Sequence, residues 1–157
     1  MNYDLVVKNG TIIDGSGGAR YRADVGILDG KIASIGRIDS KKAKTIDAEG
    51  HVVSPGFVDG HTHMDAQIFW DPIGSCSCYH GVTSVVMGNC GFTLAPSRET
   101  EADMVFRSLE RAEDLSRDAM LAGIDWSWET FPEYLDAIDR LPKGINYAGY
   151  ILSLIHI

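Results

Sequence analysis

The stretch that decides the fold is SPGFVDGHTHMD, residues 54–65. Its Ser-Pro-Gly opening is typical of a turn, because proline and glycine interrupt regular strand pairing. Phe57 and Val58 are consecutive apolar residues, which is typical of a short strand buried on both faces. Side chains alternate along a strand, so His61 and His63 are expected to point the same way. Two imidazoles on one face at the end of a strand can both reach one metal ion, and histidine is the commonest metal ligand.

A second apolar run, residues 82–87, follows the histidines and ends in Gly-Asn-Cys-Gly. The run is rich in β-branched residues and too short for a helix, so it predicts a strand. Residues 71–80 can hold at most a short helix, and a strand–crossover–strand pattern implies parallel pairing. Catalytic groups gather at the carboxyl ends of parallel barrel strands, where Cys90 also lies. As a thiolate Cys90 could bind zinc, and an inert buried thiol is the alternative.

The first 55 residues are expected to form short strands. Asn9-Gly10 and Asp29-Gly30 each lie between apolar runs, which predicts two β-hairpins. Residues 45–47 and 51–53 are shorter strand candidates. A unit of this size buries little surface alone, so we expect two thin antiparallel layers beside a larger domain.

The segment after the second strand is expected to be helical. A capping box opens at Thr100, and apolar residues then recur at helical spacing over residues 105–119. This pattern predicts one helix that ends near Gly123, with Glu113 and Arg117 paired on its solvent face.

A second capping box, Thr130 with Glu133, predicts a shorter helix that ends near Arg140. Residues 146–151 form the third predicted strand of this part of the chain.

Composition and charge exclude several classes of protein. The chain has 157 residues, a length typical of one domain, with 45% hydrophobic and 23% charged residues, as in ordinary globular proteins. Its formal net charge of −8 comes from residues 99–140, and no basic stripe points to nucleic acid. No apolar run could span a membrane, no secretory signal is evident, and three cysteines cannot make a disulfide framework. These features predict a cytoplasmic protein.

The motifs taken together resemble those of the amidohydrolase superfamily, and within it those of the D-aminoacylase (N-acyl-D-amino-acid deacylase) group. The segments that carry the resemblance are YDLVVKNG (3–10), SPGFVDGHTH (54–63), YHGVT (79–83), GNCGF (88–92) and WSWETFPEYL (126–135).

The resemblance implies an α/β fold, namely a (β/α)8 TIM barrel preceded by a small composite β-sandwich. Residues 1–55 would then be one half of the sandwich, and residues 56–151 the first three β/α units of the barrel. Residues 152–157 do not continue the family pattern and match a read-through sequencing adaptor, so we expect a non-native tail. Such a chain would be an amino-terminal fragment, inactive alone and prone to aggregation at its exposed barrel edges.

The resemblance also implies the chemistry, which is that of a hydrolase acting on non-peptide carbon–nitrogen bonds. Zinc held by His61, His63 and Cys90 would serve hydrolysis of the N-acyl amide of small N-acyl-D-amino acids to a carboxylate and a D-amino acid. The proton-shuttling carboxylate is expected in a later barrel strand, so no catalytic residue is assigned here. Asp65 could orient a ligand.

Two alternatives remain open at this point. The first is a cyclic-amide hydrolase such as a hydantoinase or dihydropyrimidinase, although those enzymes use a carboxylated lysine where Cys90 is the candidate here. The second is a non-catalytic metal-binding fragment. The oligomeric state is left open.

Overall fold

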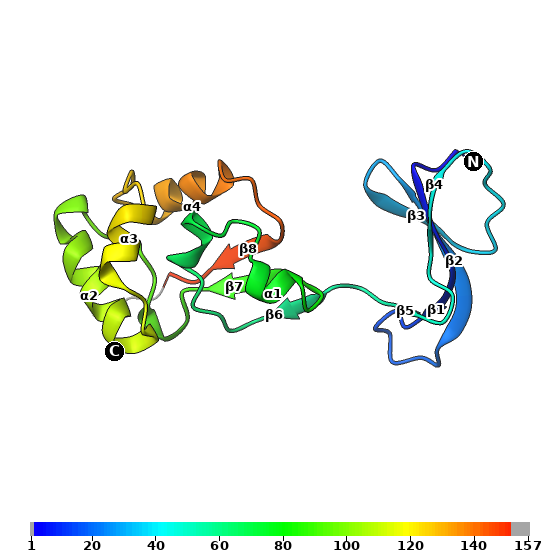
Figure 1. Ribbon diagram of the computed structural model, residues 1–157, viewed down its shortest axis with the longest axis horizontal. Coiled ribbons are helices and arrows are strands. Elements are labelled where there is room, and N and C mark those ends of the chain that lie inside the picture. The colour runs from blue at the N-terminus through cyan, green and yellow to red at the C-terminus, as the bar shows by residue number, and fades with distance from the viewer. Residues whose placement is uncertain (1, 152–157) are drawn as a thin grey trace. The chain divides into compact units, whose positions relative to one another are not determined.

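The computed structural model describes residues 2–151, and the chain divides into two compact units, residues 1–55 and 56–157, which are described separately (Figure 1). The first unit contains the strands β1 (Leu5–Ile12), β2 (Tyr21–Leu28), β3 (Lys31–Gly36), β4 (Lys44–Asp47) and β5 (Val52–Val53). They form one five-stranded sheet of order β3-β2-β1-β4, with β5 also paired to β1.

The first unit differs from the expected antiparallel layers. β2 and β3 form the predicted hairpin, with Asp29 and Gly30 at φ values of 51° and 71°, as a two-residue primed turn requires. However, β4 and β5 both run parallel to β1, so the sheet is mixed. The prediction of purely antiparallel layers was therefore wrong.

The predicted hairpin at Asn9-Gly10 is also wrong, because β1 continues through it as a single strand. Asn9 has a φ of 61°, and the β1–β2 register shifts between Val7 and Gly10. This is a β-bulge, which uses the same left-handed conformation as a tight turn without reversing the chain. The Asn9 backbone N–H donates to Asp24 Oδ1 at 2.9 Å and its amide nitrogen donates to Asp47 Oδ1 at 3.0 Å. These two bonds hold the bulge between β2 and β4.

The second unit is built on a three-stranded parallel sheet of order β6-β7-β8, made of β6 (Phe57–Asp59), β7 (Val82–Met87) and β8 (Asn146–Gly149). Helix α1 (Ser75–Cys78) lies in the crossover from β6 to β7, which confirms the predicted strand–crossover–strand pattern. The prediction that β6 is buried on both faces was wrong, since Phe57 and Val58 are 65% and 70% exposed. The reason is that β6 is an edge strand in the described residues.

The remaining helices of the second unit are α2 (Ala102–Glu113), α3 (Arg117–Gly123) and α4 (Phe131–Asp139), with short 3-10 helices η1 (Gln67–Phe69), η2 (Asn89–Gly91) and η3 (Glu99–Glu101). The single helix predicted to reach Gly123 is in fact two, because Asp114 adopts a left-handed conformation with φ 53° and ends α2. The cap predicted at Thr100 is also wrong: at this point the Glu101 side chain accepts a hydrogen bond of 3.3 Å from the Arg98 backbone N–H, and no side chain caps the start of α2. By contrast, the capping box of Thr130 and Glu133 is confirmed at the start of α4.

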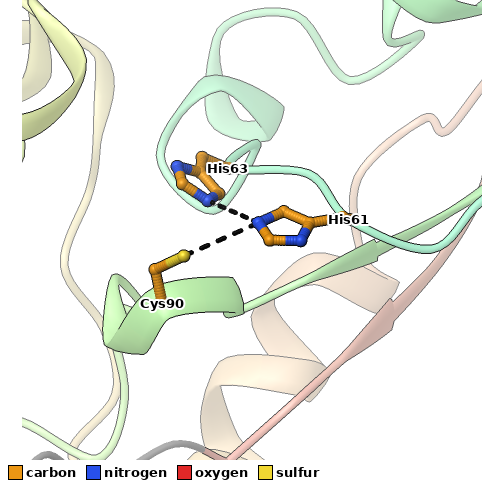
Figure 2. A group of neighbouring side chains, drawn as sticks. All are labelled: His61, His63 and Cys90. Carbon is orange, nitrogen blue, oxygen red and sulfur yellow. Dashed lines mark hydrogen bonds between the residues drawn. The ribbon is translucent and has the colours of Figure 1, made fainter.

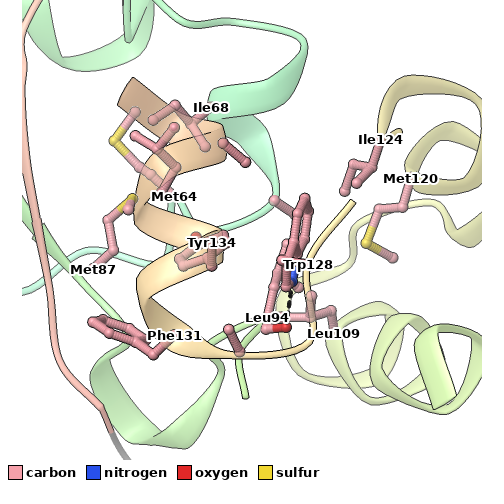
Figure 3. Packing of buried hydrophobic residues seen from close by; sticks show 14 of the residues in the cluster. Met64, Ile68, Met87, Leu94, Leu109, Met120, Ile124, Trp128, Phe131 and Tyr134 are labelled. Atoms are coloured by element: carbon pink, nitrogen blue, oxygen red, sulfur yellow. Dashed lines mark hydrogen bonds between the residues drawn. The ribbon is translucent and has the colours of Figure 1, made fainter. Parts of the chain in front are cut away.

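The core of the second unit gathers around α4 (Figure 3). Tyr134 is fully buried, and its ring lies 5.2 Å from that of Trp128. The Trp128 indole N–H donates to the Leu94 carbonyl at 3.0 Å, so the loop before α4 is fixed to the segment after β7. No helix in the described part of the chain is both long enough and apolar enough to cross a membrane.

Candidate metal centre

Three predicted ligand side chains meet beyond the carboxyl ends of β6 and β7 (Figure 2). The Nε2 atoms of His61 and His63 are 3.3 Å apart, and His61 Nε2 lies 3.6 Å from Cys90 Sγ. All three candidate ligand atoms lie within 4.8 Å of one another. Within residues 2–151 this is the one group of three or more His, Cys, Asp or Glu side chains that meets such a spacing.

Two of the three separations between these atoms fit the requirements of zinc. A tetrahedral zinc ion has Zn–N distances of about 2.05 Å and Zn–S distances of about 2.3 Å, which separates two nitrogens by about 3.3 Å and a nitrogen from a sulfur by about 3.6 Å. The two contacts around His61 have these separations. Imidazole nitrogen and thiolate sulfur are also the donors that zinc prefers. Three protein ligands would leave a fourth position open, as in catalytic zinc sites.

The backbone of the loop after β7 presents Cys90 to the histidines. Gly88 and Cys90 have φ values of 79° and 57°, so the chain turns sharply into η2. Gly88 N–H donates to Asp65 Oδ2 at 2.9 Å, and the Asn89 side chain donates to the Thr62 carbonyl at 3.3 Å. Both bonds join the Cys90 loop to the histidine loop. The relative positions of the two loops are therefore fixed by hydrogen bonds outside the ligand set.

Asp65 follows the histidine pair by two residues and is 2% exposed. Burial raises the pKa of its carboxyl group to about 6, against the lowering effect of the Gly88 N–H. Its backbone carbonyl accepts a hydrogen bond of 3.1 Å from the Tyr134 hydroxyl, whose own pKa is raised by burial. Asp65 thus connects the histidine loop to the Cys90 loop and to the core. The Asp65 carboxylate accepts from a backbone N–H and not from a histidine ring, which differs from the ligand-orienting contact suggested by the sequence.

Glu113 is the residue of this site that sequence reasoning missed. It is the last residue of α2, and its Oε1 contacts His63 Nδ1. The predicted pair of Glu113 with Arg117 does not form in the described structure, because α2 ends before Arg117, which contacts Asp103 instead. No signal in the sequence pointed to this contact, because Glu113 lies inside the helix predicted to reach Gly123 and becomes a terminal residue only because Asp114 ends α2.

Comparisons with known proteins identify relatives of this chain. The model of the amidohydrolase family matches residues 44–151. The D-aminoacylase of Alcaligenes xylosoxydans xylosoxydans is 36% identical over 147 residues, which cover 93% of this chain and 28% of that protein. The D-hydantoinase of Rhizobium radiobacter is 41% identical over 90 residues, which cover 57% of this chain and 18% of that protein.

Among solved structures, the N-acyl-D-glutamate deacylase of Bordetella bronchiseptica, complexed with zinc and a phosphonate inhibitor, matches with a TM-score of 0.75 and 33% identity. The match covers 96% of this chain and 30% of that one. The chain thus spans between a quarter and a third of the length of these deacylases. The family model covers most of the chain, including both histidines and the cysteine of the site. The mixed α/β chain therefore belongs to the amidohydrolase family.

Proposed function

We propose that this chain holds the metal-binding part of a zinc-dependent hydrolase that cleaves the amide bond of N-acyl-D-amino acids. The observation that carries the proposal is the convergence of the His61, His63 and Cys90 side chains within 4.8 Å, with the two separations from His61 Nε2 matching those of tetrahedral zinc. In this proposal all three residues are zinc ligands. When bound, the ion supplies Lewis-acid chemistry, which polarises a carbonyl and makes hydroxide available near neutral pH.

The accessibility of the site supports a catalytic rather than a purely structural centre. His61 and Cys90 are exposed, so a small substrate could approach the ligand atoms from solvent. His63 is held from its other side by Glu113 and by the ring of Phe92, whose centroid lies 5.6 Å away. These residues would keep the His63 ring in place while substrate binds.

The substrate class is proposed from the relatives. The D-aminoacylase match covers nearly the whole chain, and the solved neighbour is named as an N-acyl-D-glutamate deacylase. We further propose that residues 1–55 are one half of a composite β-sandwich and that β6, β7 and β8 are the first three strands of a TIM barrel, because three parallel strands with helical crossovers suit that fold. The adaptor-derived tail predicted over residues 152–157 lies outside the described residues.

A zinc titration of the chain tests the metal centre. The parent is expected to bind one zinc ion, and His61→Ala, His63→Ala and Cys90→Ala should each weaken binding severely, because each removes one of three ligands. His80→Ala and Cys76→Ala are matched controls, since both residues are exposed and neither belongs to the cluster. Zinc binding that survives the cluster substitutions, or that fails equally in the controls, would refute the assignment.

The reaction is tested in a chain extended to the full length of the relatives. Release of D-amino acids from N-acetyl-D-amino acids, with the L-enantiomers as controls, is the expected result. The partial match to a D-hydantoinase favours cyclic-amide hydrolysis as the second candidate. Ring opening of hydantoins without deacylation would replace the first proposal by the second. Zinc binding with neither activity would leave a non-catalytic metal-binding protein.

A further inference from the structure

Glu113 and His63 form a pair that joins the carboxyl end of α2 to the histidine loop. Glu113 Oε1 contacts His63 Nδ1 across 50 positions of sequence, and the two side chains are 24% and 22% exposed. Water therefore screens this contact less than it screens a fully exposed pair. A carboxylate only accepts hydrogen bonds, so Nδ1 of a neutral His63 must carry the ring proton. That leaves Nε2 as the free nitrogen.

The free nitrogen is the one that faces the candidate site. His63 Nε2 is the atom that lies 3.3 Å from His61 Nε2. A neutral imidazole binds metal through its unprotonated nitrogen, and the hydrogen bond made by the other nitrogen decides which one that is. The contact with Glu113 thus selects the tautomer that a ligand at this position needs, before any metal is present.

The local structure of α2 supports a dedicated role for Glu113. Asp114 adopts the left-handed conformation and ends the helix there, so Glu113 lies in its last turn. A negative charge at this end is disfavoured by the helix dipole. The arginine four residues later contacts Asp103, and contacts Asp118 at 3.8 Å, instead of Glu113. The N–H of His63 is the compensating donor.

We propose that Glu113 is a positioning residue, which holds His63 in the Nδ1–H tautomer and turns Nε2 toward His61 and Cys90. This inference rests on the proposed metal centre for its purpose, but the tautomer itself can be observed in the metal-free chain. Substitution of such an outer partner typically lowers metal affinity 10- to 100-fold.

The test combines two measurements on the 157-residue chain with Glu113→Ala, Glu113→Gln and the control Asp114→Asn. Asp114→Asn removes the same charge one residue away at an exposed position, and asparagine tolerates the left-handed conformation. Nitrogen-15 spectra of the metal-free chain should show His63 as the Nδ1–H tautomer in the parent and in Asp114→Asn, and a tautomer mixture in Glu113→Ala. Glu113→Gln keeps an acceptor oxygen and the side-chain shape, so it should retain the parent tautomer and a folded spectrum.

Zinc affinity, measured by competition with a chromophoric chelator, is expected to fall 10- to 100-fold in Glu113→Ala, less in Glu113→Gln, and less than twofold in Asp114→Asn. Two results would overturn the inference: a parent His63 protonated on Nε2, or equal losses of affinity in Asp114→Asn and Glu113→Ala. Failure of the parent to bind zinc through the three ligands would instead refute the proposed metal centre. The spectra would still test the Glu113 contact.

Discussion

Gly81 and Gly88 flank β7 and allow a sharp test of how the Cys90 loop is positioned. Both have left-handed backbones, with φ values of 83° and 79°. A Cβ atom at Gly81 would lie 3.6 Å from the Phe57 ring, which is an ordinary contact. A Cβ atom at Gly88 would lie 2.5 Å from the carbonyl oxygen of Tyr150, and no change of rotamer can move a backbone atom. Substitution by alanine therefore has the same conformational cost at both positions, and only at Gly88 does the added Cβ atom also clash with a neighbour.

These contacts set how far each substitution should lower the free energy of unfolding. An alanine forced into the left-handed conformation costs about 1–2 kcal/mol, which is the whole expected loss for Gly81→Ala. Crowding adds about 1–3 kcal/mol, so Gly88→Ala should lose about 2–5 kcal/mol. The backbone shift at Gly88 also weakens its hydrogen bond to Asp65 and moves η2, which carries Cys90. Gly88→Ala should therefore lower zinc affinity at least about tenfold, and Gly81→Ala should leave it unchanged.

Urea-induced unfolding gives the free energy of unfolding of each variant, and chelator competition gives its zinc affinity. Equal losses of stability in the two variants would show that the close approach to Tyr150 does not constrain Gly88. Unchanged zinc affinity in a destabilised Gly88→Ala would show that the position of η2 does not matter to the site. Either outcome refutes the reasoning.

Three further predictions concern Asp65, the core and the sheet edge. Because burial raises the pKa of Asp65 from 3.8 to about 6, the native state binds the extra proton between these pH values, and the free energy of unfolding falls as pH rises through this window. Over this window the free energy of unfolding should fall by about 3 kcal/mol, at about 1.36 kcal/mol per pH unit. Measured by urea titration with a chelator present, Asp65→Asn should not show this fall. A constant difference in the free energy of unfolding between variant and parent from pH 4 to 8 would contradict the prediction. Tyr134→Phe deprives the Asp65 carbonyl of its 3.1 Å hydrogen bond and should cost about 1–3 kcal/mol in urea unfolding, whereas Tyr150→Phe, at a half-exposed position, should cost nothing measurable. We expect the chain to aggregate through the exposed edge strand β6, and Val58→Lys should lower this aggregation, measured by light scattering, because an edge lysine opposes strand addition. An equal effect of Leu121→Lys on α3 would indicate a general effect of charge.

Several elements of the fold follow from short-range signals in the sequence. The hairpin of β2 and β3, the capping box of α4 and the crossover between β6 and β7 were all predicted correctly, because each depends on residues close in the sequence. Asn9-Gly10 shows the limit of such signals. Its positive φ serves a bulge as well as a turn, and only the pairing of both halves of β1 with β2 distinguishes the two.

The candidate site also combines features that follow from the sequence with features that depend on tertiary packing. The sequence by itself placed His61, His63 and Cys90 after two parallel strands, because strand alternation and parallel pairing bring the carboxyl ends of neighbouring strands together. The contact of Glu113 with His63 depends on where α2 ends and on how the helix packs, across 50 positions of sequence. Burial of Asp65 and exposure of β6 likewise depend on which neighbours cover them. Spacing therefore brought the candidate ligands together, the resemblance assigned Cys90 to them, and only tertiary packing decided which groups surround them, because long-range contacts leave no local periodicity in the sequence.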